Sequence, residues 1–420
     1  MKLMKRLVRF NSKKIIWPRL SPSFKFSKSF FYWFVPFIFL SLAILILLVL
    51  NYNFKNQALV SKIISPAKII NVAESFSAQL YFNNEFGTTE FSDVIIKALD
   101  QAKSKIEVAV YSLDHQPIRE ALYRAANRGV KVTLILSDKE LEGHNRVFKD
   151  LPANIERLDV KGMTVNSNFS GSMHHKFILI DRGIETEKLF FGAYNFTFLQ
   201  EKYDPSFLME TRRSEIIKIF GEEFDRIYQL AKGKKIAKED YSPFAALINY
   251  PEGYLEIWFC PQLGSGGLRD RLLGLIREAN SNLEVMIWHL TDNVVAKELA
   301  IKALNKTKVK ILTDDFNFLN KDSAFPVLIA LKKQTTSNNL EILTDLNRNQ
   351  EIKEKFKEPN LNSFLHHHLL LVDSKIALFG TNNWSSNGFF NNNESAMVTN
   401  IPSIFNAFKS AFEVNYEKAK

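Results

Sequence analysis

The feature that most constrains the fold of this 420-residue chain is an internal duplication. Two stretches show the same succession of an amphipathic helix, a strand, a second helix and a second strand. The segments are 92–103, 105–113, 117–129 and 130–136 in the first copy, and 268–280, 282–290, 293–307 and 309–312 in the second. Strands that alternate with helices in both copies predict an α/β fold with helices packed on a sheet.

Duplication also predicts the domain organisation. We expect pseudo-two-fold symmetry between two tandem domains, so that equivalent segments of both halves meet at one interface. A lysine-rich stretch at 232–240, followed by Pro243 and Pro251, marks the boundary between the copies. We therefore place the first domain at 75–235, a linker at 236–251 and the second domain at 252–420.

Five of the eight histidines fall in two short clusters, one late in each copy. Each cluster precedes four apolar residues, an aspartate and then a Gly-x-x-Asn element: His174-His175-Lys176, Asp181 and Gly192 to Asn195 in the first copy, and His366-His367-His368, Asp373 and Gly380 to Asn383 in the second. On a strand, alternate side chains share a face, so the first and third residues of each cluster project together.

An imidazole, a cation and an amide thus gather at one end of a predicted hairpin in each half. Phosphodiester transfer without a metal needs a nucleophile, a proton donor for the leaving oxygen and fixed donors for the phosphoryl oxygens. Histidine serves either of the first two roles because its unperturbed pKa lies near neutrality. Lysine and asparagine supply the remaining donors.

A metal site at the second cluster is the competing interpretation. Adjacent histidines on a strand point to opposite faces, and no matching carboxylate or thiol cluster accompanies them in the sequence. We therefore expect neither a metal nor another cofactor.

The motifs resemble the signature of the phospholipase D superfamily, His-x-Lys-x4-Asp followed by Gly-Ser/Thr-x-Asn, a superfamily that also includes cardiolipin synthases and several nucleases. The resemblance covers residues 75–420 because both copies end in the motif. It implies two tandem phospholipase D-like domains, each a mixed sheet flanked by helices. It also assigns catalytic roles to His174, Lys176, Asn195, His366, His368, Thr381, Asn383 and Glu394, and structural roles to Asp181, Gly192, Asp373 and Gly380.

In this family one histidine becomes a covalent phosphohistidine and the other protonates the leaving group. By resemblance, His174 is the nucleophile, and His366 is the general acid and then the base toward water. Glu394 falls where the family has an acidic residue that orients a catalytic histidine. Glu210 is a looser candidate for that role in the first half.

Two positions depart from the family pattern. His368 replaces the second lysine, and Ala193 replaces the serine or threonine after Gly192. A neutral histidine is a weaker phosphate ligand than lysine, because it donates a single hydrogen bond and carries no charge. Slower catalysis, a lower pH optimum or loss of activity are the expected consequences.

Residues 30–50 form an uncharged apolar run of the length that a membrane-spanning helix needs. Of the 55 basic residues nine lie in 1–28, which has no acidic residue, so 46 basic and 45 acidic residues remain elsewhere. The positive-inside bias predicts a basic cytoplasmic tail at 1–29, a single membrane helix, a linker at 51–74 and an extracytoplasmic body, in a bacterial cell envelope.

The predicted function is that of a membrane-anchored phosphodiesterase that hydrolyses phospholipids or transfers their phosphatidyl group. The anchor and the nearly neutral body favour a lipid over a nucleic acid, so an extracytoplasmic endonuclease with the same chemistry is the second choice. A catalytically weakened phosphate- or lipid-binding protein is the third. No obligate protein partner is predicted.

Overall fold

The computed structural model describes residues 68–83, 90–140, 151–152, 154–160, 171–234, 245–261, 266–333, 338–357 and 363–420. The predicted basic tail at 1–29 and the predicted membrane helix at 30–50 lie outside these residues. Within the part that is described, no helix combines the length and the apolar composition needed to cross a bilayer.

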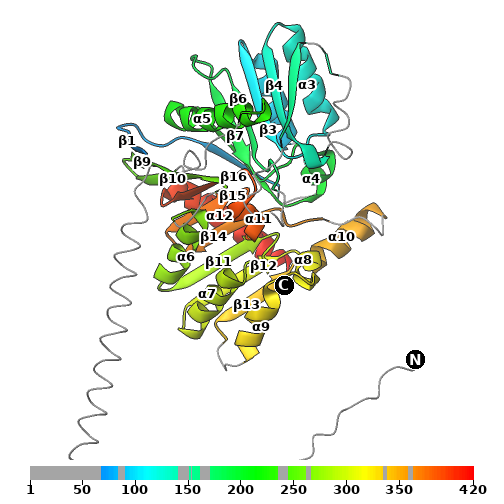
Figure 1. Cartoon of the computed structure of the whole chain (residues 1–420). Coiled ribbons are helices and arrows are strands. Elements are labelled where there is room, and N and C mark those ends of the chain that lie inside the picture. Colours follow the sequence, from blue (N-terminus) through cyan, green and yellow to red (C-terminus); the bar gives the residue numbers. More distant parts are fainter. Residues whose placement is uncertain are drawn as a thin grey trace, which may run out of the picture. The chain divides into compact units, whose positions relative to one another are not determined.

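The first half of the chain folds into a mixed seven-stranded sheet (Figure 1). In spatial order its strands are β2 (Gln79–Phe82), β8 (Phe207–Thr211), β7 (Lys188–Gly192), β6 (Lys176–Ile180), β3 (Lys105–Val110), β4 (Lys131–Ser137) and β5 (Ile155–Val160). Strands β3, β4 and β5 are parallel, whereas the pairs from β2 to β3 are antiparallel.

The second half forms a nine-stranded sheet. In spatial order its strands are β1 (Lys68–Asn71), β9 (Ala245–Tyr250), β10 (Gly253–Cys260), β16 (Glu394–Thr399), β15 (Ile376–Gly380), β14 (His368–Val372), β11 (Asn282–Ile287), β12 (Lys308–Thr313) and β13 (Leu340–Thr344). From β10 to β13 the order repeats that of the first sheet strand by strand, as the duplication predicts. The two histidine clusters therefore precede or begin equivalent strands, β6 and β14.

The two additional strands of the second sheet come from segments that the sequence assigned to linkers. β1 lies within 51–74 and β9 within 236–251, and the two pair in parallel at the sheet edge. β9 also pairs with β10 in an antiparallel hairpin. Residues on both sides of the first domain therefore belong structurally to the second sheet.

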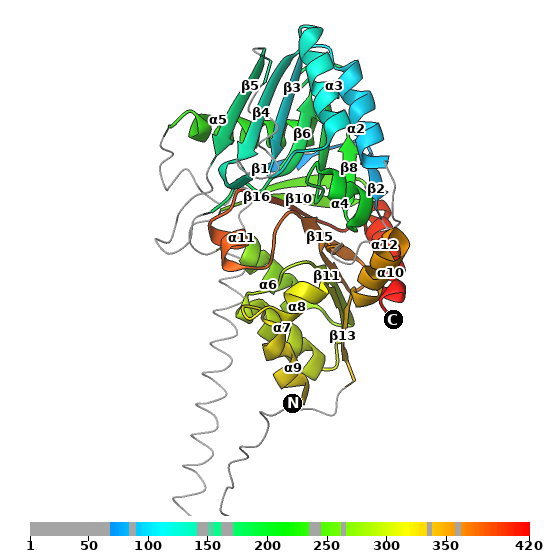
Figure 2. The same ribbon diagram turned by 90° about the vertical axis from the view of Figure 1, so that its right-hand side faces the viewer.

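Helices cover the outer faces of both sheets (Figures 1 and 2). The first sheet packs against α2 (Glu90–Gln101) and α3 (Gln116–Asn127), and the second against α6 (Leu268–Glu278), α7 (Asn293–Leu304) and α9 (Phe325–Lys333). The longer helices α5 (Ser214–Ala231) and α12 (Pro402–Lys418) join the core between the sheets. The shorter helices are α4 (Phe198–Tyr203), α8 (Asp315–Leu319), α10 (Leu346–Phe356), α11 (Ser386–Phe390) and a 3-10 turn at Asp138–Glu140.

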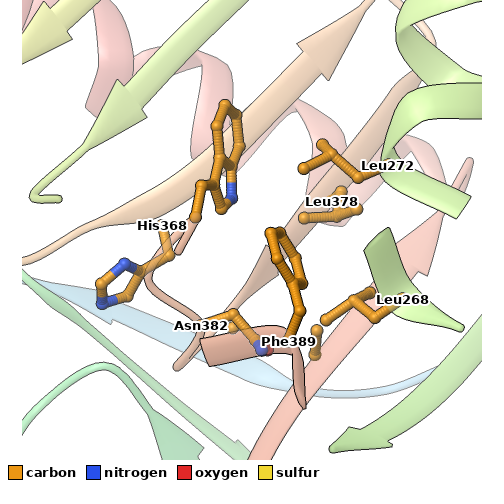
Figure 3. A pocket seen from close by; sticks show the side chains of 9 residues that line it. Leu268, Leu272, His368, Leu378, Asn382 and Phe389 are labelled. Carbon is orange, nitrogen blue, oxygen red and sulfur yellow. The ribbon is translucent and has the colours of Figure 1, made fainter. Parts of the chain in front are cut away.

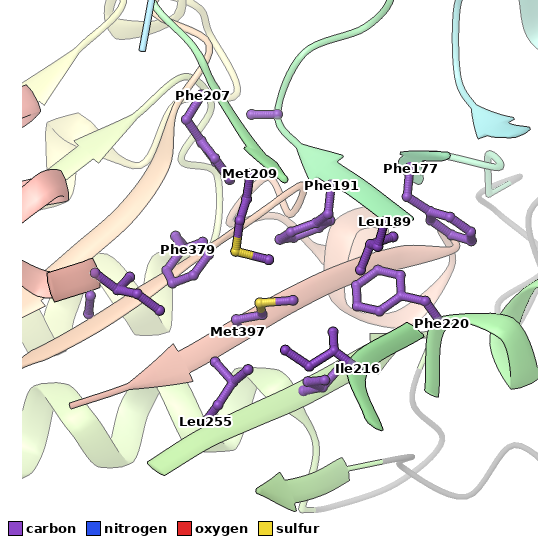
Figure 4. Close-up of a cluster of buried hydrophobic side chains, with 14 of the residues drawn as sticks. Phe177, Leu189, Phe191, Phe207, Met209, Ile216, Phe220, Leu255, Phe379 and Met397 are labelled. Carbon is purple, nitrogen blue, oxygen red and sulfur yellow. The ribbon is translucent and has the colours of Figure 1, made fainter. Parts of the chain in front are cut away.

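A single apolar core joins the inner faces of the two sheets (Figure 4). In β6, Phe177 and Leu179 face this core, whereas Ile178 and Ile180 face the core under α2 and α3. The run is apolar throughout because the strand is buried on both faces. At the boundary between the two sheets, which we call the seam, the ring centroids of Phe207 and Phe379 are 5.6 Å apart. This packing fixes the two halves relative to each other, and with them the two motifs.

Candidate active site

Each histidine of the predicted pair is held by the backbone of the other half. The N–H of His174 donates to the carbonyl oxygen of Asn393 at 2.9 Å, and the N–H of His366 donates to that of Pro205 at 2.9 Å. The two bonds are equivalent under the pseudo-symmetry, since each acceptor lies just before β16 or β8. The structure thus brings both motifs to one seam. Both are buried: His174 is 7 % exposed and His366 is 5 % exposed.

Glu394 is the centre of the hydrogen-bond network around His174. Its Oε2 lies 2.8 Å from Nδ1 of His174 and accepts a bond of 2.6 Å from Oγ1 of Thr381. Its Oε1 accepts from Nδ2 of Asn392 at 2.9 Å. The carboxylate is fully buried. Because the carboxylate binds Nδ1, it leaves Nε2 of His174 for a substrate. Thr381, predicted as a catalytic donor, supports Glu394 instead.

The first half offers no carboxylate in the equivalent place. Ala396 pairs with Gly380 and Leu208 pairs with Gly192, so the residue equivalent to Glu394 is Ser206. Among the described residues, Oγ of Ser206 and Nδ1 of His366 have no hydrogen-bond partner. The backbone of Ala193 opposes the lowering of the pKa of His366, but burial outweighs it.

The suggestion that Glu210 orients a histidine is therefore wrong. Glu210 lies further along β8, where it pairs with Phe190 and Gln79. Its carboxylate binds Nζ of Lys188 at 2.8 Å and the hydroxyl of Tyr81 at 3.3 Å. The sequence offered Glu210 as a nearby acid, but the strand register places Ser206 at the site.

Lys176 lies beside the same histidine. Its Nζ donates to the carbonyl oxygen of His174 at 3.0 Å and lies 5.8 Å from the centroid of the Tyr111 ring. Because the ammonium is completely buried, its pKa falls from 10.5 to about 7, although Glu394 partly opposes the shift. The free site therefore holds a lysine that titrates near neutral pH.

Charges from both halves act on the histidines of the second cluster. Burial lowers the pKa of His366 well below its usual value, and the charges of Lys176 and His174 lower it further. Burial likewise lowers the pKa of His368, followed by the charges of His366, Lys176 and His174. For His174 itself burial also lowers the pKa and outweighs the opposing effect of Glu394.

His368 occupies the place of the second motif lysine. Its ring lies 5.5 Å from that of His366, centroid to centroid, and neither of its nitrogens has a hydrogen-bond partner among the described residues. Figure 3 shows it at the margin of a small pocket, with the imidazole directed away from Leu272, Leu378 and Phe389. The ring is thus a neutral, buried group with two unoccupied nitrogens.

Two aromatic residues that the sequence analysis did not assign complete the site. Tyr111 packs against the ring of His174 with centroids 4.9 Å apart, and Trp288 stacks on His366 at 5.0 Å. Both follow the last residue of equivalent strands, β3 and β11. Aligning the two copies would have identified them, because each is the first residue after its strand.

The Gly-x-x-Asn elements lie at the ends of β7 and β15. A Cβ atom at Gly192 would collide with the carbonyl oxygen of Phe207, and one at Gly380 with that of Ser395. Each glycine thus permits close approach of the neighbouring strand. The amide oxygens of Asn195 and Asn383 have no hydrogen-bond partner among the described residues.

The middle histidine of the first cluster has a structural role. Nε2 of His175 lies 2.8 Å from the carboxylate of Glu223 on α5, and its Nδ1 lies 3.2 Å from Oγ of Ser395. His175 is completely buried on the face opposite Lys176. The predicted alternation of side chains along this strand is therefore confirmed.

The motif aspartates hold turns in both halves. Asp181 accepts bonds from the backbone N–H groups of Lys103, Ser104 and Lys105, and Asp373 accepts from those of Asn280, Ser281 and Asn282. These backbone bonds lower the pKa of Asp373 to about 2, although burial opposes them. Both aspartates adopt positive φ, 55° and 51°. They fix the far ends of the β6–β7 and β14–β15 hairpins.

We expect Asp181→Ala to lower the free energy of unfolding by about 3 kcal/mol, because several backbone donors lose a buried charged acceptor. Glu413→Ala, which removes an exposed partner of Lys409, should change it by less than about 1 kcal/mol. Chemical denaturation of both variants measures the difference. Equal stabilities would contradict the structural role of Asp181.

One group of carboxylates in the described residues has metal-site geometry. Oxygen atoms of Asp314, Asp315 and Asp345 lie within 4.8 Å of one another. Burial raises the pKa of Asp314 to about 6. Asp314 also accepts from the backbone N–H of Asn317 at 2.9 Å and caps α8, and Asp345 accepts from that of Asp315 at 3.0 Å. Neither motif histidine belongs to this group.

Comparison with known proteins agrees with the duplicated architecture. The family described as "Cardiolipin synthase, PLD-like domain" matches twice, over residues 95–228 and 272–415. A phospholipase D of Rickettsia typhi is 31 % identical over 121 residues, which cover 29 % of this chain and 53 % of the relative. A mitochondrial cardiolipin hydrolase of Mus musculus is 28 % identical over 138 residues, 32 % of this chain and 57 % of the relative.

The chain thus spans little more than half the length of these two relatives. A crystal structure of the phosphatidylserine synthase of Haemophilus influenzae shares the fold over 82 % of this chain and 86 % of that one, with a TM-score of 0.56 and 13 % identity. The two family matches fall on the two halves that carry the histidine clusters. The chain therefore belongs to the cardiolipin synthase and phospholipase D-like family, with two copies of its domain in tandem.

Proposed function

We propose that the protein is a phosphodiesterase that cleaves phospholipids through a phosphohistidine on His174. The observation that carries the proposal is the bond between Nδ1 of His174 and Glu394, which has no counterpart at His366 in the part of the chain that the structure describes. A buried carboxylate on Nδ1 makes Nε2 the nucleophilic nitrogen and stabilises the positive charge that develops on the ring. His174 is therefore the nucleophile, and His366 is left for proton transfer.

In the first step, the Nε2 lone pair of His174 attacks phosphorus and the bond from phosphorus to the head-group oxygen breaks. His366 gives its proton to that oxygen. In the second step, water or an alcohol attacks phosphorus while His366 accepts its proton, and the P–N bond breaks to regenerate His174. His366 must be protonated at the start, and the bound anionic diester favours this by raising its lowered pKa.

Lys176, Asn195 and Asn383 are proposed to bind the phosphoryl oxygens. The ammonium of Lys176 lies near the histidines, and its charge lowers the pKa of His366. The two asparagines have amide oxygens without partners among the described residues, so their amides are free to reorient toward a ligand. Such fixed donors stabilise the charge that builds up in the transition state.

Three observations favour a phospholipid substrate. The sequence predicts a membrane helix at 30–50, and the chain outside the basic tail is nearly neutral. Two relatives carry the names phospholipase D and mitochondrial cardiolipin hydrolase. We therefore propose a single-pass protein of the bacterial cell envelope, with a cytoplasmic N-terminus and its body on the extracytoplasmic side, where it hydrolyses phospholipids or transfers their phosphatidyl group.

In the test, the full chain in detergent is incubated with a panel of diesters. No metal is added, and EDTA is present. The panel contains phosphatidylcholine, phosphatidylglycerol, cardiolipin, and single- and double-stranded DNA. We expect release of phosphatidate, or of a phosphatidyl ester when an alcohol is present, with a His174→Ala preparation as the background. A labelled phosphatidyl group should remain on the protein in acid-labile form, and should accumulate in His366→Ala when the substrate has a leaving group that needs no proton.

Cleavage of DNA without release of any lipid product would contradict the proposed lipid substrate but not the proposed phosphohistidine chemistry. No turnover of any diester, together with retained binding of inorganic phosphate, would contradict the catalytic proposal as a whole. It would indicate that a chain with His368 and Ala193 at these motif positions binds a phosphate without cleaving it.

A further inference from the structure

The described residues include nine large apolar side chains that are exposed to solvent. Four of them lie on two short helices: Phe198 and Leu199 on α4, exposed by 53 % and 52 %, and Phe316 and Leu319 on α8, exposed by 66 % and 80 %. The other five are scattered over β1, the β6–β7 turn, α7 and α12. We call the four residues the apolar rim.

The two helices of the apolar rim come from different halves but are joined by hydrogen bonds. The carbonyl oxygen of Tyr203, the last residue of α4, accepts from Oγ of Ser363 at 2.6 Å. The N–H of Ser363 donates to Oδ1 of Asn349, and Nδ2 of Asn349 donates to Asp315, the first residue of α8. Figures 1 and 2 both show α4 and α8 near each other at the seam of the two sheets.

Both helices also lie next to the catalytic groups. Phe198 follows Asn195 by three residues, and its N–H donates to Asp114 at 3.0 Å. On α8, the amide oxygen of Asn317 lies 2.6 Å from Nδ1 of His289, the residue after Trp288, which stacks on His366. The two helices that carry the exposed side chains are thus connected to Asn195 in one half and, through His289 and Trp288, to His366 in the other.

We propose that the apolar rim inserts into the interface of a phospholipid bilayer and places the active site at the level of the head groups. The inference rests on the proposed function, because it takes the substrate to be a membrane lipid. Apolar side chains near a cation favour such an interface. Nζ of Lys202 on α4 lies 5.5 Å from the centroid of the Phe198 ring and matches the negative charge of phosphate head groups.

A bilayer suits this surface better than a protein partner. The exposed apolar side chains lie on two short helices that belong to different halves of the molecule. A lipid whose phosphate must reach the site cannot leave the bilayer without exposing its acyl chains to water, which is unfavourable. Contact between the rim and the acyl region removes this cost while the head group enters.

The test uses the full chain in lipid nanodiscs of phosphatidylglycerol and phosphatidylcholine. The native Cys260 is buried, so single cysteines introduced as Phe198→Cys or Leu319→Cys take an environment-sensitive fluorophore selectively. We expect a blue shift and strong quenching by lipids that carry a nitroxide on the acyl chain. Ile184→Cys, exposed by 42 % in the β6–β7 turn, is the matched control and should show neither effect.

Kinetics give a second readout. Phe198→Ser and Leu319→Ser together should raise the apparent KM for bilayer phospholipid by about tenfold, equivalent to about 1.4 kcal/mol. Turnover of a water-soluble diester should stay unchanged, because neither side chain is part of the catalytic machinery. Ile184→Ser should leave both reactions unchanged.

Labels at 198 and 319 that behave like the label at 184 would overturn the inference, and so would equal losses on soluble and bilayer substrates. These outcomes are distinguishable from failure of the proposed function. The fluorescence measurement does not depend on turnover, and hydrolysis of the soluble diester reports the chemistry independently of the bilayer.

Discussion

Replacing Glu394 with glutamine is expected to lower kcat by about 10³-fold, although the side chain keeps its size. The carboxylate accepts bonds from Thr381 and Asn392 as well as contacting His174. A glutamine has only one acceptor oxygen, so its NH₂ group must face one of these donors. Loss of the charge also removes the stabilisation of the cationic ring during formation and breakdown of the phosphohistidine.

The matched control is Glu210→Gln. Glu210 is bound by Lys188 and Tyr81 away from the histidines, so we expect kcat within about twofold of the wild type for a substitution that leaves the site intact. Steady-state kinetics with saturating phospholipid, together with thermal unfolding of each variant, separate catalysis from stability. Equal rates for the two variants would contradict the role assigned to Glu394 and, with it, the choice of His174 as nucleophile.

Thr381 belongs to the same hydrogen-bond network as Glu394. Thr381 donates its hydroxyl hydrogen to the carboxylate at 2.6 Å, so that hydrogen is not left for a phosphoryl oxygen. Its contribution acts through the position of Glu394. Thr381, which the motif suggests as a phosphate ligand, thus supports the carboxylate that binds the proposed nucleophile.

Much of the fold was predictable because it is encoded locally and twice. The apolar run before Asp181 and the one before Asp373 share length and spacing, and both become strands buried on two faces. The amphipathic segments that precede the β3 and β11 strands become α2 and α6. Agreement between two independent copies of the same pattern made these assignments secure.

What the sequence did not reveal depends on long-range register. Glu394 binds a histidine 220 positions away, in the other half, although the histidine cluster at 366–368 is much nearer in sequence. The same register puts Ser206, a residue with no distinguishing pattern, in the matching place of the first half. Spacing along one chain segment cannot show which half supplies the partner.

The edge strands are a second example. β1 and β9 pair in parallel across more than 170 residues of sequence, and neither segment repeats in the other copy. A composition rich in proline and lysine around 232–251 indicates a connection between domains. The short strand that this connection also contributes becomes recognisable only when its partners are in place.

The low pKa that burial gives to Lys176 predicts how kcat/KM varies with pH. In the free enzyme the pKa of Lys176 is about 7, so the ammonium is charged below that pH and loses its proton as the pH rises through it. The phosphoryl group is anionic throughout, and a neutral amine binds it weakly. Because His366 must also be protonated, kcat/KM already declines above the lowered pKa of that histidine. Loss of the Lys176 charge should add a further decrease above about pH 7, by roughly tenfold for each further pH unit.

Two variants assign this fall to Lys176. Arginine keeps its charge at every accessible pH, so Lys176→Arg should lose the decrease near pH 7 even if its maximum is lower. His368→Gln should keep the decrease, because burial and the neighbouring cations already hold the pKa of His368 well below its usual value and leave the ring neutral. A profile of kcat/KM from pH 5.5 to about 9 measures all three proteins. If the decrease survived in Lys176→Arg and vanished in His368→Gln, the titrating group would be His368. The histidine that replaces the motif lysine would then be the charged phosphate ligand of this enzyme.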